Sequence, residues 1–263
     1  MAIFFTLVSF FGILGTFIGG LIGVFFNFKS PKTLSCILEF AAGLMLAVVT
    51  FDLLPESFEF GGNYATIIFF IIGVIVAILL ENLVNKFQKA RVTRPHGSKK
   101  LDKNHSSWQL GTKKNNTNLI TTGILVGIGL ALHNFPEGLA IGSGFSASPE
   151  LGLSLALVIA FHDIPEGISM AVPMKAGGMG IFRTLLLTFL SGVPTALGAY
   201  LGMIIGNISK VAVAACLAFA GGTMSYIISG DLILESKKLY GGRLPSLFNV
   251  LGFTLGIVAV KFF

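Results

Sequence analysis

Charged residues are scarce in this sequence. They make up 11% of its 263 residues, and 54% of the residues are hydrophobic, which gives a mean hydropathy of +0.86. A soluble domain carries about 25% charged residues, so this composition excludes an ordinary soluble protein. Several segments reach the ~20 apolar residues that a membrane-spanning helix needs. The sequence therefore predicts a multi-pass protein of the cell membrane.

A cysteine framework and a signal-peptide pattern are missing as well. Cys36 and Cys216 are the only cysteines, and they offer neither a disulfide framework nor a C-x-x-C metal motif. The first apolar segment, 2–26, has no charged region ahead of it and no A-x-A-like cleavage site. This pattern favours a retained helix over a signal peptide.

The apolar segments predict an all-α, polytopic membrane protein that forms a single transmembrane domain over residues 1–263. Between the third and fourth segments, residues 86–118 are hydrophilic and rich in Lys, Asn, Ser and Thr, which predicts a flexible basic loop. We expect eight transmembrane helices, at residues 2–26, 34–56, 63–85, 118–143, 151–173, 182–206, 211–235 and 245–263.

Basic residues indicate how these helices are oriented. The net charge is +6, which in a soluble protein would suggest nucleic acid as a partner. Here the basic residues cluster in the predicted connecting loops, so they report topology and we expect no nucleic acid to bind. If both termini are extracytoplasmic, 16 of the 18 Lys and Arg residues lie on the cytoplasmic side, and only Lys210 and Lys261 do not. The loop 86–118 is then cytoplasmic.

Two of the predicted helices resemble each other without a gap. Phe40-Ala-Ala-Gly-Leu-Met matches Phe219-Ala-Gly-Gly-Thr-Met, and further along Asp52 and Glu56 match Asp231 and Glu235. In the predicted topology the two copies run in opposite directions. This indicates an inverted repeat, with spans 1–3 and 6–8 flanking the central fourth and fifth helices, an arrangement typical of transporters.

A six-residue motif occurs twice in the fourth and fifth apolar segments. It reads His-Asn-Phe-Pro-Glu-Gly from His133 and His-Asp-Ile-Pro-Glu-Gly from His162. On a helix, at about 100° per residue, the His and the Glu four positions later lie within about 40° of each other. Each motif can therefore hold one ion between its His and its Glu, and each Glu can also reach toward the Asn or Asp beside the His.

The proline inside each motif strengthens this interpretation. Pro136 and Pro165 cannot donate a backbone hydrogen bond, and they predict a kink with a freed carbonyl. Within a bilayer such a carbonyl is tolerated where it faces protein, water or an ion, so the motifs are expected to line a cavity.

Ionisable residues in apolar segments indicate what passes through that cavity. Each would cost roughly 2.5 kcal/mol or more if it faced lipid, so we expect them to line a path. His with carboxylate suits Zn²⁺, Fe²⁺, Mn²⁺ and Cd²⁺, whereas Mg²⁺ and Ca²⁺ prefer oxygen alone. The residues are His133, Glu137, His162, Asp163, Glu166, Asp52, Glu56, Asp231 and Glu235.

The paired motifs, on the fourth and fifth of eight spans after a basic loop, resemble the ZIP (Zrt/Irt-like) family of divalent-metal transporters. The resemblance covers the whole chain. It implies metal uptake into the cytoplasm, zinc first with iron, manganese or cadmium as further substrates, by an elevator-type alternating-access mechanism. It implies a metal ion as substrate and no cofactor.

The resemblance also implies a binuclear site and a path. One metal position would use His133, Glu137, His162, Glu166 and Met45. The adjacent position would use Asn134, Asp163 and the same two glutamates. The acidic residues Asp52, Glu56, Asp231 and Glu235 match positions that the family uses along the metal path.

The sequence departs from the family at one position of the sixth span. Many relatives have Ser-Gly-x-x-Glu-x-x-Gly there, and this chain has Thr195 in place of the glutamate. The second metal position therefore lacks one charged ligand, and we expect it to bind weakly or to serve as a transit stop.

Two other functions use similar residues. An intramembrane zinc hydrolase would let the ion activate water, but the sequence has no H-E-x-x-H motif and no nucleophile motif, and a hydrolase has no obvious use for an inverted repeat. A metal-selective channel would use the same ligands as a carrier. The sequence leaves open the physiological metal, proton coupling and whether the protein is a homodimer.

The charge bias gives a test of topology. With Cys36 and Cys216 replaced by Ser, a cysteine at Ser106 should resist an impermeant thiol reagent in intact cells and react once the cells are permeabilised, because the loop is cytoplasmic. Ready labelling in intact cells would reverse the orientation, and uptake would become export.

Overall fold

The computed structural model describes residues 2–26, 30–92 and 116–262, and over these residues the chain consists of helices joined by short turns, without a strand. This confirms the all-α class. The elements, including two π-helical segments η1 and η2, are α1 (Ala2–Phe25), α2 (Pro31–Val48), η1 (Val49–Leu53), α3 (Leu54–Val92), α4 (Asn116–Ala147), α5 (Pro149–Ala176), α6 (Ile181–Gly206), α7 (Lys210–Ile227), η2 (Ile228–Leu232), α8 (Ile233–Leu239) and α9 (Leu244–Phe262).

Most of these helices are long and apolar enough to cross a membrane. Among the described residues six stretches qualify, and Phe10–Phe25 is a shorter apolar helix. The six stretches are Pro31–Leu83, Leu119–Ala147, Pro149–Ala176, Ile181–Gly206, Lys210–Leu239 and Leu244–Lys261. Because a membrane-spanning helix needs ~20 apolar residues, the chain is a multi-pass membrane protein.

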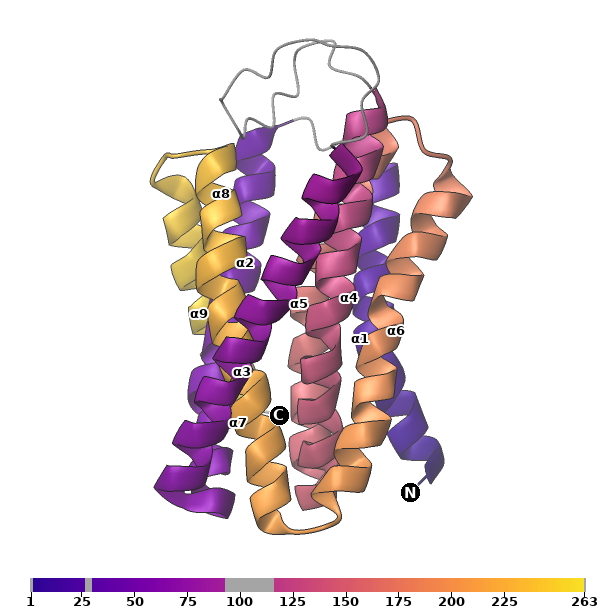
Figure 1. The fold of residues 1–263 in the computed structure, drawn as a ribbon. Coiled ribbons are helices and arrows are strands. Elements are labelled where there is room, and N and C mark those ends of the chain that lie inside the picture. Colours follow the sequence, from indigo (N-terminus) through magenta and orange to yellow (C-terminus); the bar gives the residue numbers. More distant parts are fainter. Residues whose placement is uncertain (1, 27–29, 93–115, 263) are drawn as a thin grey trace.

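The longest of these stretches, Pro31–Leu83, reverses direction inside its length. Gly62 has φ 68° and ψ 179°, a backbone conformation open to glycine and strained for other residues. The chain descends through α2 and η1, turns in this region and returns through α3 (Figure 1). The turn lies within the predicted connection between Glu56 and Asn63.

The predicted loop 86–118 is partly helical. Helix α3 continues to Val92 and α4 begins at Asn116, so both ends of the predicted loop belong to helices. Residues 93–115 lie outside the described residues. Helices α4 and α5 also continue through Pro136 and Pro165 rather than ending there.

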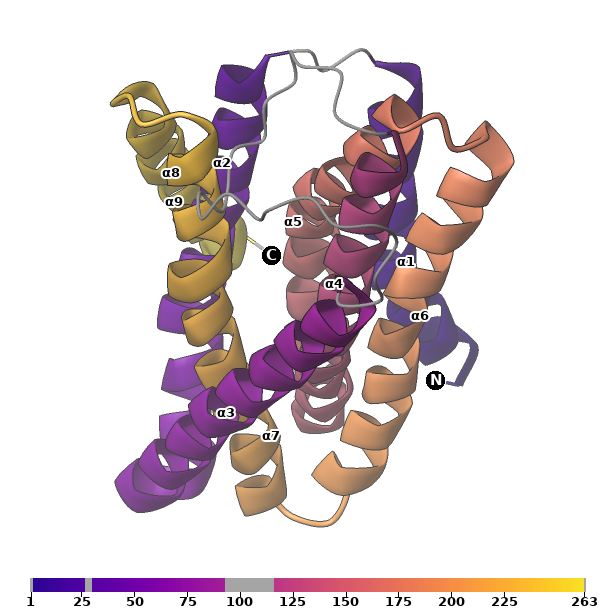
Figure 2. The same cartoon turned by 45° about the horizontal axis from the view of Figure 1, so that its top comes forward.

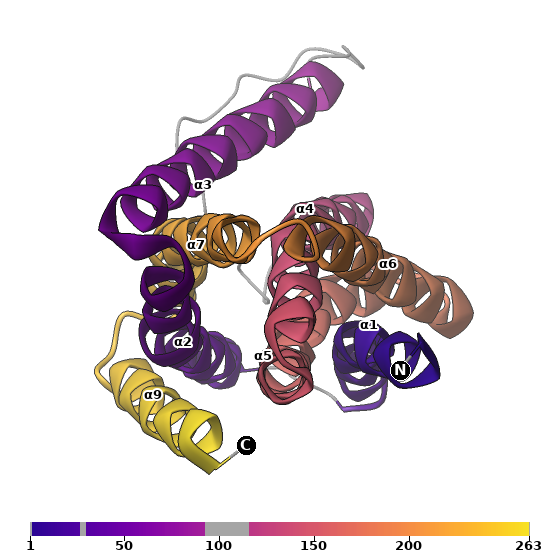
Figure 3. The same cartoon turned by 90° about the horizontal axis from the view of Figure 1, so that it is seen from below.

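The helices form two groups, seen from two further directions in Figures 2 and 3. In one group α4 and α5 pack against each other and against α6 and α1. In the other, α3 packs along α7, and α2 packs along α9. The groups meet where α4 approaches α7 and α5 approaches α2. An apolar core between them includes Met45, Ile141, Ile159 and Met224.

Glycine lets neighbouring helices approach to backbone contact within these groups. A side chain at Gly222 of α7 would collide with the Phe70 carbonyl of α3, and one at Gly138 of α4 would collide with the Thr195 carbonyl of α6. Without a hydrophobic driving force between helices in lipid, such close packing stabilises their association.

This packing generates a matched pair of substitutions. Gly222→Ala should destabilise the purified protein by about 1–3 kcal/mol, because backbone atoms of α3 must move away. Gly221→Ala should be neutral, since its nearest neighbour would lie 3.8 Å from the added carbon. Thermal unfolding in detergent measures both, and equal melting temperatures would contradict the close contact between α3 and α7.

Candidate metal site

Four residues of the two motifs face each other at the centre of the bundle. His133 and Glu137 lie one turn apart on α4, and His162 and Glu166 lie one turn apart on α5. Three of them are fully buried, and His133 is 7% exposed. The sequence placed each pair on one helix face, and the packing of α4 on α5 brings the two faces together.

The pairs contact each other crosswise. His162 Nε2 lies 2.8 Å from Glu137 Oε1, and His133 Nε2 lies 3.1 Å from Glu166 Oε1. Within α4, His133 Nε2 is 3.6 Å from Glu137 Oε1. Each histidine therefore approaches the glutamate of the other helix more closely than histidine and glutamate approach each other along α4.

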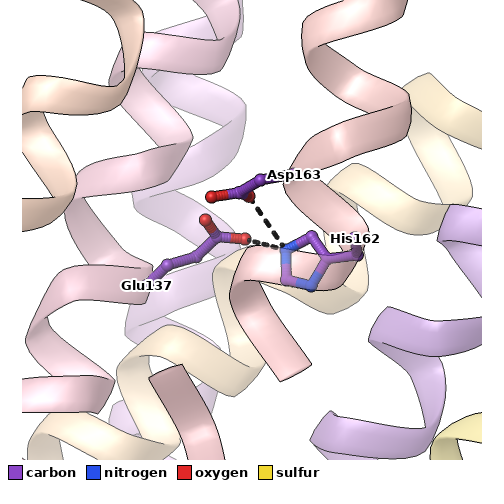
Figure 4. Close-up of side chains that lie close together, drawn as sticks. All are labelled: Glu137, His162 and Asp163. Atoms are coloured by element: carbon purple, nitrogen blue, oxygen red, sulfur yellow. Dashed lines mark hydrogen bonds and ion pairs between the residues drawn. The ribbon is translucent and has the colours of Figure 1, made fainter. Parts of the chain in front are cut away.

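Asp163 completes a compact cluster with two of these residues. Its Oδ1 lies 3.4 Å from His162 Nε2, and Asp163 and Glu137 both point toward that nitrogen (Figure 4). Glu137, His162 and Asp163 each offer a ligand atom within 4.8 Å of the others, and all three are buried. This spacing is suitable for one metal ion bound by a nitrogen and two carboxylates.

Several polar atoms of the site lack a hydrogen-bond partner among the described residues. They are Glu137 Oε2, both carboxylate oxygens of Glu166 and Asp163, His133 Nε2 and His162 Nδ1, and of these Glu166 Oε1, Asp163 Oδ1 and His133 Nε2 make only the ion-pair contacts given above. Burying a carboxylate without a partner costs several kcal/mol. Because a cation could satisfy these acceptors together, the arrangement fits a site for a positive ion better than a structural hydrogen-bond network.

Asn134 and Thr195 lie beside the cluster, on α4 and α6. Asn134 Nδ2 donates to the Ser191 carbonyl at 2.8 Å. Asn134 Oδ1 and Thr195 Oγ1 are buried and have no hydrogen-bond partner in the described part of the chain. Both residues are fully buried. The packing of α6 on α4 thus brings Thr195 next to the first motif, where its carbonyl lies against Gly138.

Met45 and Met224, which match each other in the sequence, are both fully buried members of the apolar core. Met45 lies on α2, which packs against the motif helix α5, and Met224 lies on α7, which packs against α4. A role for Met45 as a ligand stays a prediction.

The four acidic residues that were expected along the metal path differ in exposure. Asp52 lies on η1 and is 8% exposed, whereas its matched residue Asp231 lies on η2 and is exposed. Glu56 and Glu235 are partly buried. The matched residues Asp52 and Asp231 therefore lie in different environments, although the sequences around them are similar.

A cavity of about 520 Å³ connects the site with one end of the bundle. His133 and Pro136 line its inner part, and Asp231 and Glu235 line it further along. Thr122, near the start of α4, also lines the cavity. Because α4 begins at the top of Figure 1, the cavity extends toward that end of the bundle. The first motif thus lines a cavity, as expected, whereas no residue of the second motif, 162–167, is among those that line it.

Two buried or cavity-lining acidic residues escaped the sequence analysis. Glu81 of α3 lines the cavity and accepts a hydrogen bond from the Tyr226 hydroxyl of α7. Glu39 of α2 is 2% exposed, and its Oε1 lies 3.1 Å from Lys237 Nζ. An acidic residue within an apolar segment was the signal that could have identified both.

Comparison with known proteins agrees with this site. The family model described as ZIP zinc transporter matches residues 1–262. The chain is 34% identical over 249 residues to the zinc transporter ZupT of Shigella flexneri serotype 5b (strain 8401), which covers 91% of each chain. ZupT of Chlorobaculum parvum is 32% identical over 240 residues, 87% of this chain and 85% of the relative.

A third relative, the zinc transporter GufA of Myxococcus xanthus, is 40% identical over 149 residues, 56% of each chain. The family model covers nearly every residue, and the ZupT proteins align over most of their length. This chain therefore belongs to the ZIP zinc transporter family.

Proposed function

We propose that this protein carries divalent transition-metal ions, zinc above all, into the cytoplasm by alternating access through the His/Glu site of α4 and α5. The observation that supports this best is the crosswise contact of two histidines with two glutamates whose remaining oxygens have no hydrogen-bond partner. Membership of a family of zinc transporters gives the substrate class. The relatives reported above are named as transporters and not as enzymes.

The donor set suits zinc and its neighbours in the transition series. Imidazole nitrogen together with carboxylate oxygen binds Zn²⁺, Fe²⁺, Mn²⁺ and Cd²⁺. In the proposed first position the ion is held by His133, Glu137, His162 and Glu166, with Met45 as a fifth ligand. Glu137 and Glu166 also reach a second position beside Asn134 and Asp163, because each has an oxygen that no protein group satisfies.

The cavity supports release toward the cytoplasm. It leads from His133 past Asp231 and Glu235 to the end of the bundle where α3 ends and α4 begins. In the topology that the bias of basic residues favours, this end is cytoplasmic and both termini lie on the opposite side. We therefore interpret the structure as an inward-facing state, in which an ion leaving the site passes acidic side chains.

We count eight crossings in this topology. The stretch Pro31–Leu83 supplies two, because the chain reverses at Gly62. Helix α1 has 24 residues, enough to cross once. The remaining crossings are α4, α5, α6, the continuous stretch from α7 to α8, and α9.

The helix boundaries support an inverted repeat. Pro31–Val48 corresponds to Lys210–Ile227, and the π-helical Val49–Leu53 corresponds to Ile228–Leu232, by a constant shift of 179 residues. A π-helical turn is rare and often marks a functional site. Two such turns at matched positions, each with an aspartate, are better explained by a shared origin than by chance.

Hydrogen bonds between the repeats follow the same shift. Ser57 Oγ donates to the Ala214 carbonyl at 2.9 Å, and Ser236 Oγ donates to the Ser35 carbonyl at 3.2 Å. Ser57 matches Ser236, and Ala214 matches Ser35. The two bonds therefore correspond under a pseudo-two-fold relation between α2 and α7.

The repeat provides a mechanism for alternating access. In an inverted repeat the two halves exchange conformations between the two states. Asp52 is buried here and Asp231 is exposed to the cavity, so the opposite state would expose Asp52 and bury Asp231. The group with α4 and α5 would slide against the group with α2 and α7 along their apolar contact.

The site generates the first functional prediction. Glu137→Ala, Glu166→Ala or His133→Ala should abolish uptake of radioactive zinc into proteoliposomes, because each removes a ligand from the first position. Asp163→Ala should leave substantial uptake, since in the proposed arrangement Asp163 is a ligand of the second position and all the proposed ligands of the first position remain. Glu150→Ala, an exposed glutamate on α5, is the control. If Asp163→Ala is as inactive as Glu166→Ala, the two-position arrangement is wrong.

Met45 generates the second prediction. A thioether favours soft ions, so Met45→Ala should reduce cadmium uptake more than zinc uptake. Met224→Ala is a matched control, because it is equally buried in the same core, and it should affect both ions alike. Equal losses of cadmium and zinc uptake in Met45→Ala would leave Met45 a packing residue.

A further inference from the structure

A lysine lines the cavity through which the ion is proposed to leave. Among the described residues that line this cavity, Lys238 is the only lysine or arginine, and the carboxylates are those of Glu81, Asp231 and Glu235. A cation that leaves the site at His133 therefore passes three acidic side chains and one ammonium group. Because like charges repel, an ammonium on the path of a cation needs a reason.

Lys238 is paired with one of these carboxylates. Its Nζ lies 3.3 Å from Glu235 Oε2, and the two side chains are 40% and 33% exposed. The same ammonium interacts electrostatically with Asp231, one step further along the cavity wall. An ion pair between partly exposed groups is weak. A divalent ion that reaches Glu235 can therefore displace the lysine.

The neighbouring lysine shows what a structural ion pair in this helix looks like. Lys237 Nζ lies 3.1 Å from Oε1 of the buried Glu39 and donates to Ser246 Oγ at 2.7 Å. Lys237 does not line the cavity, and its charge compensates a carboxylate that is shielded from water. Lys238 has no such task, because its partner Glu235 is partly exposed and lines the cavity.

The inverted repeat provides a comparison for Lys238. The shift of 179 residues that relates α2 to α7 matches Lys238 with Glu59 of α3, and the two acidic positions before it are acidic in both copies. In the first copy, Asp52, Glu56 and Glu59 form a series of like charges that interact with one another. The second copy ends in a lysine instead. The two copies thus differ in the sign of the charge at the third position.

This third position lies toward the outer end of each series. Glu59 is exposed, Glu56 is partly buried and Asp52 is 8% exposed, so the first copy presents a negative charge to an arriving cation. A charge at the mouth of a cavity changes the local concentration of ions there. In the proposed topology, the extracytoplasmic end therefore attracts divalent cations, and Lys238 opposes their entry at the cytoplasmic end.

We propose that Lys238 is a tethered counter-ion at the exit of the transport path, which holds Glu235 between transport cycles and repels divalent ions that approach from the cytoplasm. The inference rests on the proposed function, because it requires ions to leave through this cavity. An ion arriving from the site displaces the ammonium from Glu235, and the ammonium returns as the ion leaves. Because Lys238 ends each cycle where it began, it supplies no net energy. It weakens binding from the cytoplasmic side and makes release easier.

Zinc transport measured from each side of the membrane tests this proposal. Right-side-out and everted membrane vesicles are prepared from cells that express the full-length protein, and vesicles from cells without it give the background. Entry of radioactive zinc yields a half-saturating concentration for each side. Lys238→Met should lower this concentration in everted vesicles about tenfold, the lower end of what a charged cavity does to local ion concentrations. In right-side-out vesicles it should change little.

Three further measurements separate the charge from a structural role. Lys238→Arg keeps the charge and should behave as the unmodified protein does in both kinds of vesicle. The effect of Lys238→Met should shrink at high ionic strength, because salt screens the repulsion, whereas a change in packing would persist. Arg183→Gln removes an exposed positive charge at the same end of the bundle but outside the cavity lining, and it should alter neither side.

The matched position of the first copy gives the reciprocal experiment. Glu59→Lys places an ammonium at the extracytoplasmic end, so it should raise the half-saturating zinc concentration in right-side-out vesicles and leave everted vesicles nearly unchanged. An increase of the same size on both sides would mean that the charge at this position does not act on its own side of the membrane, and the comparison between the copies would be wrong.

The role of Lys238 and the proposed function fail in different ways. If Lys238→Met shifts both kinds of vesicle equally, shifts right-side-out vesicles alone, shifts neither or carries no zinc from either side, the role of Lys238 is wrong, while zinc transport by the unmodified protein stands. If the unmodified protein carries no zinc in either kind of vesicle, the proposed function itself is wrong, and the role of Lys238 is wrong with it.

Discussion

Buried carboxylates without enough protein partners are the constraint on which this structure depends. Glu137, Asp163 and Glu166 have at most 1% of their side chains exposed, and five of their six oxygens lack a hydrogen bond among the described residues. A bilayer offers them no water, so each must find a cation, a histidine or a neighbouring donor. The crosswise contacts with His133 and His162 supply part of this compensation, and the proposed metal ion would supply the remainder.

The helices around the site pack closely against α4 and α5. The histidine and glutamate of the α4 motif face α5, and its glycine faces α6. A side chain at Gly138 would collide with the Thr195 carbonyl of α6. On the other side, Gly167 of α5 meets the Thr16 carbonyl of α1 in the same way. In each motif the final glycine, four residues after the asparagine or aspartate, thus lets a flanking helix approach closely. The motif therefore specifies helix packing as well as metal ligands.

The contact between the two groups of helices has a different character. Within each group, glycines bring backbones together, whereas the apolar core between the groups contains flexible and small side chains such as Met45, Ala140, Ala220 and Met224. Methionine adapts to irregular surroundings, and alanine offers little to interlock. Such a surface is suitable for one group to slide on the other, which is what the proposed alternating access requires. The cavity at His133 lies beside this contact.

The sequence by itself determined the helices, the membrane environment and the two motif faces, because these follow from local periodicity and composition. It also placed His133 with Glu137 and His162 with Glu166, since residues four apart must share a helix face. The tertiary structure alone decided that each histidine pairs with the glutamate of the other helix, that Asp52 is buried while Asp231 is exposed, and that Glu39 and Glu81 have partners on distant helices. It also decided that Asn134 of α4 donates to the Ser191 carbonyl of α6. These outcomes depend on which helices lie side by side and at what depth, and no local pattern in a chain specifies the contacts between segments far apart in it.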